Sequence, residues 1–115
     1  MANPNSTTVH RDIGLMWDMI SGTTTTIVKA IIVRGQRRVK NIVGTTTGAN
    51  HDEAIRALSD AFAVDNALSN LDPNKDNIEG AITMRDNFVK DCDNSLRLLG
   101  KSLDGIKIQF SKVNP

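Results

Sequence analysis

Residues 23–47, TTTTIVKAIIVRGQRRVKNIVGTTT, include fifteen β-branched residues out of twenty-five, and this segment decides the expected fold. Such side chains are restricted in a helix and pack well on a pleated surface, so the composition favours β-strands. Residues 34–37 (RGQR) lie between two runs, 24–33 and 38–43, and contain the glycine that a tight turn needs. The sequence therefore predicts a β-hairpin over Thr23–Thr47.

The first strand of this hairpin would be apolar on both of its faces. Its side chains would divide into two sets, with Ile27, Ile31 and Val33 on one face and Val28, Ala30 and Ile32 on the other. A sheet with one face in water alternates apolar and polar residues instead. Because a chain of 115 residues has few elements to cover both faces, we expect one face to contact a partner.

Helical spacing of apolar residues marks the segments on either side of the hairpin. It predicts a first helix over Val9–Ile20, with Gly22 as its stop. It predicts a second helix that Asn50 caps together with Glu53 three residues later. The apolar stripe of this second helix includes Asp65 and consists of Ala54, Ile55, Leu58, Ala61, Phe62, Asp65 and Leu68.

A third helix is expected to begin at Asp72-Pro73, because Asp is a good N-cap and Pro suits the first helical position. Its stripe includes Arg85 and consists of Ile78, Ile82, Arg85, Val89, Cys92, Leu96 and Leu99, and Gly100 follows as a left-handed C-cap. The connection to the second helix is short, so the two helices should form an antiparallel hairpin. Within it, we expect Arg85 and Asp65 to form a hydrogen-bonded pair that fixes the register of the helices.

Residues 103–113 fit two patterns. Ile106, Ile108 and Phe110 alternate with polar residues, which predicts a strand after the Asp104-Gly105 turn. Alternatively, Leu103, Ile106, Phe110 and Val113 continue the heptad of the third helix, which would make the protein mostly α with a long C-terminal helix.

We expect the strand, and with it an α+β fold in the order α-β-β-α-α-β. In this fold the helical hairpin packs on a small antiparallel sheet. Residues 9–115 would form one domain after a flexible N-terminus, residues 1–8.

The composition limits the class of protein. The chain is 39% hydrophobic and 23% charged, which is too apolar for a disordered chain. It has no Tyr, one Trp and three Phe, so its core has few aromatic anchors. Neither a signal peptide nor a membrane-spanning run is visible, and we expect a cytoplasmic or virion-associated protein that makes no membrane contact. A lone cysteine, Cys92, lies in a helical stripe and is expected to be a small buried hydrophobe.

The residues that could support catalysis or ligand binding do not form a known pattern. Residues 43–48 (VGTTTG) lack the spacing and the Lys-Ser/Thr of a phosphate-binding loop. Two histidines, His10 and His51, and one cysteine are too few for a zinc site without carboxylate ligands. No G-x-S-x-G motif is present. We therefore expect no enzymatic activity, no cofactor and no metal.

Charge is distributed unevenly along the chain. Residues 1–50 carry six Lys or Arg against two Asp, whereas residues 51–115 carry eight against eleven acidic residues. The predicted hairpin tip gathers four of these cations, and with the apolar face it gives the expected partner-binding set of Ile27, Ile31, Val33, Arg34, Arg37, Arg38 and Lys40.

These features predict a non-enzymatic interaction or assembly protein, such as a small viral or phage accessory or structural subunit. It would self-associate as a homo-oligomer or bind a protein partner through its hairpin. The alternative is a nucleic-acid-binding module that uses the basic tip.

Overall fold

The computed structural model describes residues 4–20, 24–44 and 48–101, and these residues form helices without a strand. The elements are α1 (Ser6–Ile13), the 3₁₀ helix η1 (Gly14–Met19), α2 (Thr24–Val43), α3 (Ala49–Leu68) and α4 (Ile78–Arg97). The expected α+β fold with an antiparallel sheet is therefore wrong, and the protein is a helical bundle. The strand expected within residues 103–113, and the long C-terminal helix that was its alternative, lie outside the described residues.

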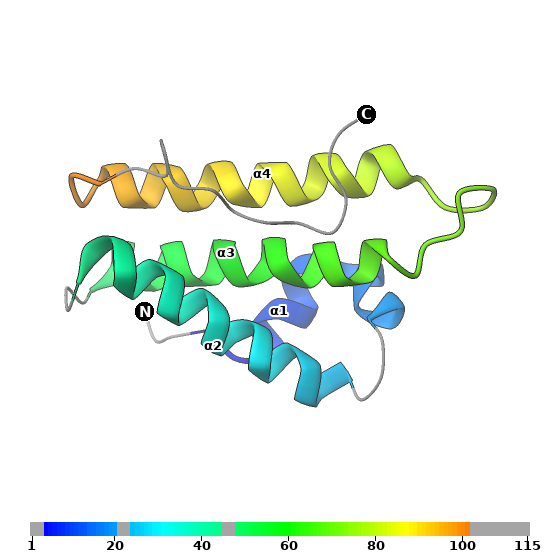
Figure 1. The fold of residues 1–115 in the computed structure, drawn as a ribbon, viewed down its shortest axis with the longest axis horizontal. Coiled ribbons are helices and arrows are strands. Elements are labelled where there is room, and N and C mark those ends of the chain that lie inside the picture. The colour runs from blue at the N-terminus through cyan, green and yellow to red at the C-terminus, as the bar shows by residue number, and fades with distance from the viewer. Residues whose placement is uncertain (1–3, 21–23, 45–47, 102–115) are drawn as a thin grey trace.

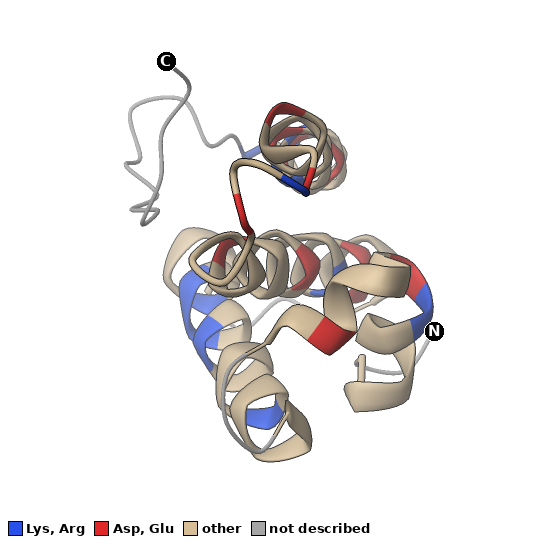
Figure 2. Ribbon diagram, turned by 90° about the vertical axis from the view of Figure 1, so that its right-hand side faces the viewer, with Lys and Arg blue, Asp and Glu red and all other residues tan. Residues whose placement is uncertain are grey.

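Helix α3 occupies the centre of the structure (Figure 1). It packs against α4 on one side and against α2, α1 and η1 on the other, and Figure 2 shows this arrangement along the bundle. Thirteen of its twenty residues are buried. Many of them are alanines. Because their side chains are small, neighbouring helices can pack close to α3 on several sides.

Residues 24–43 of the segment expected to be a hairpin form the continuous helix α2. Its buried residues are Val28, Ile31, Ile32, Gly35, Val39 and Val43. Their spacing of three and four residues places them on one helical face, which packs against α3. Most of the apolar residues that would form two faces of a strand therefore lie on one face of the helix. Their burial against α3 outweighs the weak helix propensity of Ile, Val and Thr.

Gly35, expected in the hairpin turn, lies instead in the middle of α2 at its contact with α3. A Cβ atom added there would lie 2.6 Å from Ser59 Oγ of α3. The glycine therefore permits a close approach of two helix backbones. This role differs from that of a turn glycine, and it explains why α2 tolerates a residue that disfavours helix interiors.

The antiparallel pair of helices expected after residue 50 is present as α3 and α4, but both begin at residues other than those expected. Gly48 is the N-cap of α3 in place of Asn50. Asn77 caps α4, since its side chain accepts a hydrogen bond from Gly80 N at 2.9 Å. Asp72, the expected cap, instead lies in the connection, where its Oδ1 accepts from Asn74 N at 2.8 Å.

The first helix also differs from its expected range. It begins at Ser6, where Asn5 and Thr8 form a capping box. It ends at Ile13, because Gly14, the C-cap residue, has a φ of 57° that breaks the α-helix before η1 begins. The expected stop, Gly22, lies outside the described residues. Gly100, by contrast, has a φ of 74° at the end of α4, which is the left-handed conformation expected there.

A pair of substitutions in α2 distinguishes the helix from the hairpin. Ile31 and Val33 would share one face of a strand, but in α2 Ile31 is buried and Val33 is 44% exposed. We expect Ile31→Asp to reduce the free energy of unfolding by ~3 kcal/mol or more, because it buries a charge without a partner. Val33→Asp should change it by only about 0.5 kcal/mol.

Urea unfolding followed by far-UV circular dichroism measures both effects. Equal destabilisation by the two substitutions would contradict the helix.

Candidate functional site

The outward side of α2 is a surface rich in basic side chains. The helix contains five Lys or Arg residues and no Asp or Glu. Lys29, Val33, Arg37 and Lys40 follow one another at spacings of four, four and three, and all four are exposed. This spacing places them on one helical face. We call these four residues the α2 outer face; it extends over about 16 Å of helix.

The basic residues of α2 have different environments. Within the described part of the chain, Lys29, Arg37 and Lys40 form no salt bridge. Arg34, although exposed, lies over the ring of Phe62 at 4.0 Å from its centroid, which is a cation–π contact with α3. Arg38 is half-buried. The outer face therefore offers three cations to a partner, and Figure 2 shows the basic positions along α2.

The structure separates the three apolar residues that were expected to share a docking face. Ile31 is buried in the core, and Ile27 is half-buried and packs against it. Val33 alone belongs to the outer face. This segment therefore does not need a partner to cover a second apolar face, because α3 covers its apolar side.

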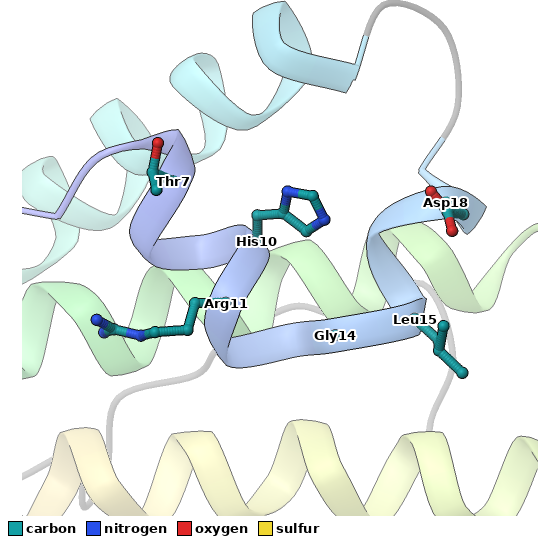
Figure 3. Close-up of a pocket in the computed structure, with 6 residues that line it drawn as sticks. All are labelled: Thr7, His10, Arg11, Gly14, Leu15 and Asp18. Atoms are coloured by element: carbon teal, nitrogen blue, oxygen red, sulfur yellow. The ribbon is translucent and has the colours of Figure 1, made fainter.

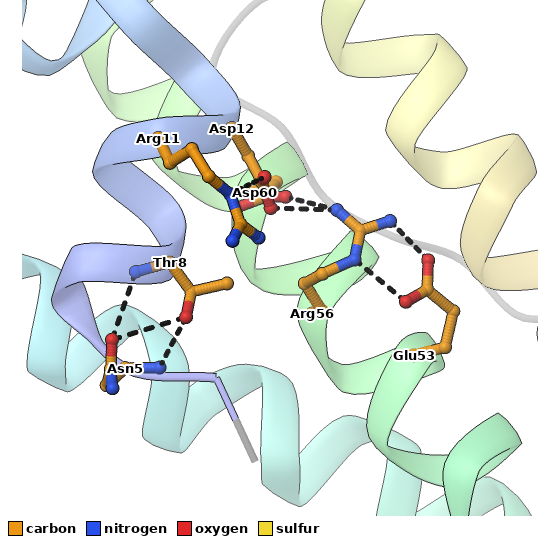
Figure 4. A network of polar contacts seen from close by, with 7 residues as sticks. All are labelled: Asn5, Thr8, Arg11, Asp12, Glu53, Arg56 and Asp60. Atoms are coloured by element: carbon orange, nitrogen blue, oxygen red, sulfur yellow. Dashed lines mark hydrogen bonds and ion pairs between the residues drawn. The ribbon is translucent and has the colours of Figure 1, made fainter. Parts of the chain in front are cut away.

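A cluster of charged side chains lies on the other side of α3, where α1 packs (Figure 4). Arg56 of α3 is at its centre. One of its Nη1 hydrogen bonds goes to Asp12 of α1 at 2.8 Å and another to Asp60 at 2.8 Å. Its Nε and Nη2 atoms donate to the carboxylate of Glu53. Arg56 thus holds α1 on α3 and donates hydrogen bonds to three carboxyl groups.

Asp60 is the most deeply buried member of this cluster, with no exposed surface. Burial, together with its hydrogen bond to Asp12 and the negative charge of Asp12, raises the pKa of Asp60 to about 10. Burial also acts to raise the pKa of Asp12, but its hydrogen bonds to Asp60 and Arg56 outweigh this and hold that pKa below the usual range. Near neutral pH, Asp60 therefore carries a proton and can donate it to the Asp12 carboxylate.

This cluster was not predicted from the sequence, although part of its pattern is visible there. Glu53, Arg56 and Asp60 follow at spacings of three and four, which brings side chains together on a helix. Nothing in the sequence indicates that Asp12, forty-four residues from Arg56, joins them.

Arg85 and Asp65, expected to pair between the second and third predicted helices, are brought together by α4 and α3. The distance from Arg85 Nη1 to Asp65 Oδ1 is 3.3 Å, and Arg85 Nε lies 3.3 Å from Asp86 Oδ1. Both Arg85 and Asp65 are buried. A buried pair of this kind is costly to break from one side, because the remaining charge loses its partner.

A second surface feature is an open depression on α1 and η1 (Figure 3). Its lining consists of Thr7, His10, Arg11, Gly14, Leu15 and Asp18. Leu15 is 83% exposed, and the His10 ring stacks on Trp17 at a centroid distance of 4.3 Å. The depression does not enclose a ligand or exclude water, which limits what its polar groups can do chemically.

Other residues that could support chemistry are unfavourably placed. Cys92 is fully buried, and burial raises the pKa of its thiol to about 12, with a smaller contribution from Asp93, so the thiol stays protonated near neutral pH. Among the residues that the structure describes, no three His, Cys, Asp or Glu side chains are grouped so that they could hold a metal ion. Over the same residues, no helix combines the length and the apolar character needed to cross a membrane.

The cluster around Arg56 makes stability depend on pH. The pKa of Asp60 rises from about 3.8 in the unfolded chain to about 10 in the folded protein, so folding takes up a proton between these values. The contribution of Asp60 to the free energy of unfolding is complete below pH 4 and is lost as the pH rises towards 10. We expect the wild type to lose about 4 kcal/mol more than Asp60→Asn between pH 5 and pH 8, since one proton taken up on folding changes the free energy of unfolding by about 1.4 kcal/mol per pH unit.

Urea unfolding at a series of pH values tests this expectation. Asp12 has a lowered pKa and contributes in the opposite sense only at acidic pH, outside this interval. Parallel pH profiles for the wild type and Asp60→Asn would contradict the protonated Asp60.

Comparison with known proteins adds no relative. Neither a protein-family model, nor a curated protein, nor a solved structure matches the chain significantly. The function must therefore be inferred from the residues and their arrangement, and the α2 outer face is the feature that best supports an inference.

Proposed function

We propose that this protein is a non-enzymatic interaction module that binds an acidic protein partner through the α2 outer face. The observation that carries the proposal is a twenty-residue helix with five basic residues and no acidic one, four of whose cations are exposed and three of these on the α2 outer face. Helices α3 and α4 both contain four acidic residues, so among the three twenty-residue helices only α2 lacks acidic side chains.

The small size of the face favours a protein over a nucleic acid. Three exposed cations over about 16 Å would neutralise few phosphates, whereas strong phosphate-backbone binding uses many. The chain as a whole has a net charge of only +1. An apolar residue within a ring of charged side chains is, in addition, the usual arrangement of a protein interface.

The distribution of acidic residues favours a different protein over a second copy of this chain. Among the described residues, only Asp18, Glu79 and Asp91 are exposed acids. Asp18 lies in η1, and Glu79 and Asp91 are twelve residues apart on α4, where Asp91 follows the exposed Lys90. These positions do not form an acidic patch that matches the α2 outer face, so we place self-association second.

A charge-reversal experiment tests the proposal. The variant Lys29→Glu/Arg37→Glu/Lys40→Glu should lose at least about tenfold in affinity for a fluorescein-labelled twenty-residue Glu/Ala peptide, since it replaces attraction by repulsion. The matched control is Lys75→Glu/Lys90→Glu/Lys101→Glu, which changes the net charge equally at exposed positions outside α2. We expect the control to bind within about threefold of the wild type. Fluorescence anisotropy at 50 mM salt measures both.

Three outcomes would contradict the proposal. The first is an equal loss of binding in the two triple variants, which would show an effect of net charge alone. The second is tighter binding of a twenty-base-pair DNA than of the peptide, which would favour the nucleic-acid alternative. The third is concentration-dependent light scattering of the wild type that the α2 variant abolishes, which would identify a second copy as the partner.

A further inference from the structure

Val33 is an unusual residue for its position. Among the described residues the large hydrophobic side chains that are strongly exposed are Leu15, Val33 and Leu98. Leu15 and Leu98 lie near the ends of elements, whereas Val33 lies in the middle of α2. Lys29 precedes it by four residues and Arg37 follows it by four, so a cation lies one helical turn away on either side.

The surroundings of Val33 extend its apolar surface. The methylene stems of Lys29 and Arg37 are apolar up to their charged ends, and such stems lie along neighbouring apolar side chains. Ala30 is also exposed next to this strip. The centre of the α2 outer face is therefore apolar, and its charges lie at the periphery.

Helix α2 is also held firmly beneath this surface. Gly35 packs closely on Ser59, and Arg34 lies over Phe62, so both contacts fix α2 on α3 within two residues of Val33. A rigid surface loses little conformational entropy when a partner binds, which favours a small interface.

We infer that the partner presents an amphipathic acidic helix, in which one apolar side chain packs on Val33 and the carboxylates one turn before and after it pair with Lys29 and Arg37. Lys40 pairs with a further carboxylate beyond Arg37. This inference rests on the proposed function and specifies the partner more closely. A uniformly acidic segment would satisfy the cations but leave Val33 in contact with water, as would a row of phosphates.

Two helical peptides of sixteen residues test the inference. In the first, a central Leu has Glu four residues before and after it; in the second, Ser replaces this Leu. We expect Val33→Ser to weaken binding of the Leu peptide by about three- to tenfold, as expected for losing an apolar contact. Binding of the Ser peptide should change by less than about twofold. Val33→Leu, which enlarges the apolar contact, should strengthen binding of the Leu peptide alone.

Leu98→Ser is the matched control, because Leu98 is 72% exposed and lies outside α2. It should bind both peptides as the wild type does. The inference is overturned if the ratio of the affinities for the Leu and Ser peptides is the same in Val33→Ser, in Val33→Leu and in the wild type. In that case the proposed electrostatic function still stands. If the wild type binds neither peptide, the proposed function itself falls.

Discussion

The burial of α3 on nearly all of its sides is the constraint on which the other elements depend. A helix enclosed in this way must present small or apolar residues in most directions, and its alanines and Leu58, Phe62 and Leu68 do so. Its polar residues then need partners from other helices. Asp65 obtains Arg85 of α4, and Asp60 shares Arg56 and Asp12 at the contact with α1. Each outer helix thus completes one side of α3.

This arrangement also determines the surface that we propose for binding. Because α3 takes up the apolar side of α2, Lys29, Arg37 and Lys40 remain exposed on the outer side of the helix. Arg34 lies at the boundary between the outer side of α2 and the side that packs on α3, since it is exposed but contacts Phe62 of α3. The charge asymmetry between the two halves of the sequence becomes, in the structure, a basic outer face on one helix.

The sequence predicted α3 and α4 well because their apolar residues repeat with a clear helical period. It also pointed to Arg85 and Asp65, since a charged residue within an apolar stripe needs a partner. Residues 24–43 could not be assigned correctly in the same way. Their β-branched residues favour strands locally, and only contact with α3 makes the helix favourable. In the sequence Gly35 resembles a turn glycine, and only its contact with Ser59 of α3 shows that it is a packing residue.

The candidate site was predicted in part. The basic residues of α2 were identified as a group, but their division into exposed and core-packed side chains requires the helical geometry. The pairing of Arg56 with Asp12 depends on a contact between distant segments, which no local pattern contains.

The central role of α3 can be tested most directly by native-state amide hydrogen exchange, measured by NMR and compared with the global free energy of unfolding. If every outer helix depends on α3, the amides of Leu58–Val64 should exchange only through global unfolding, with opening free energies as high as any in the protein. Faster exchange of these amides than of those in the middle of α2 and α4 would contradict the account, because α3 would then open while its neighbours stayed folded.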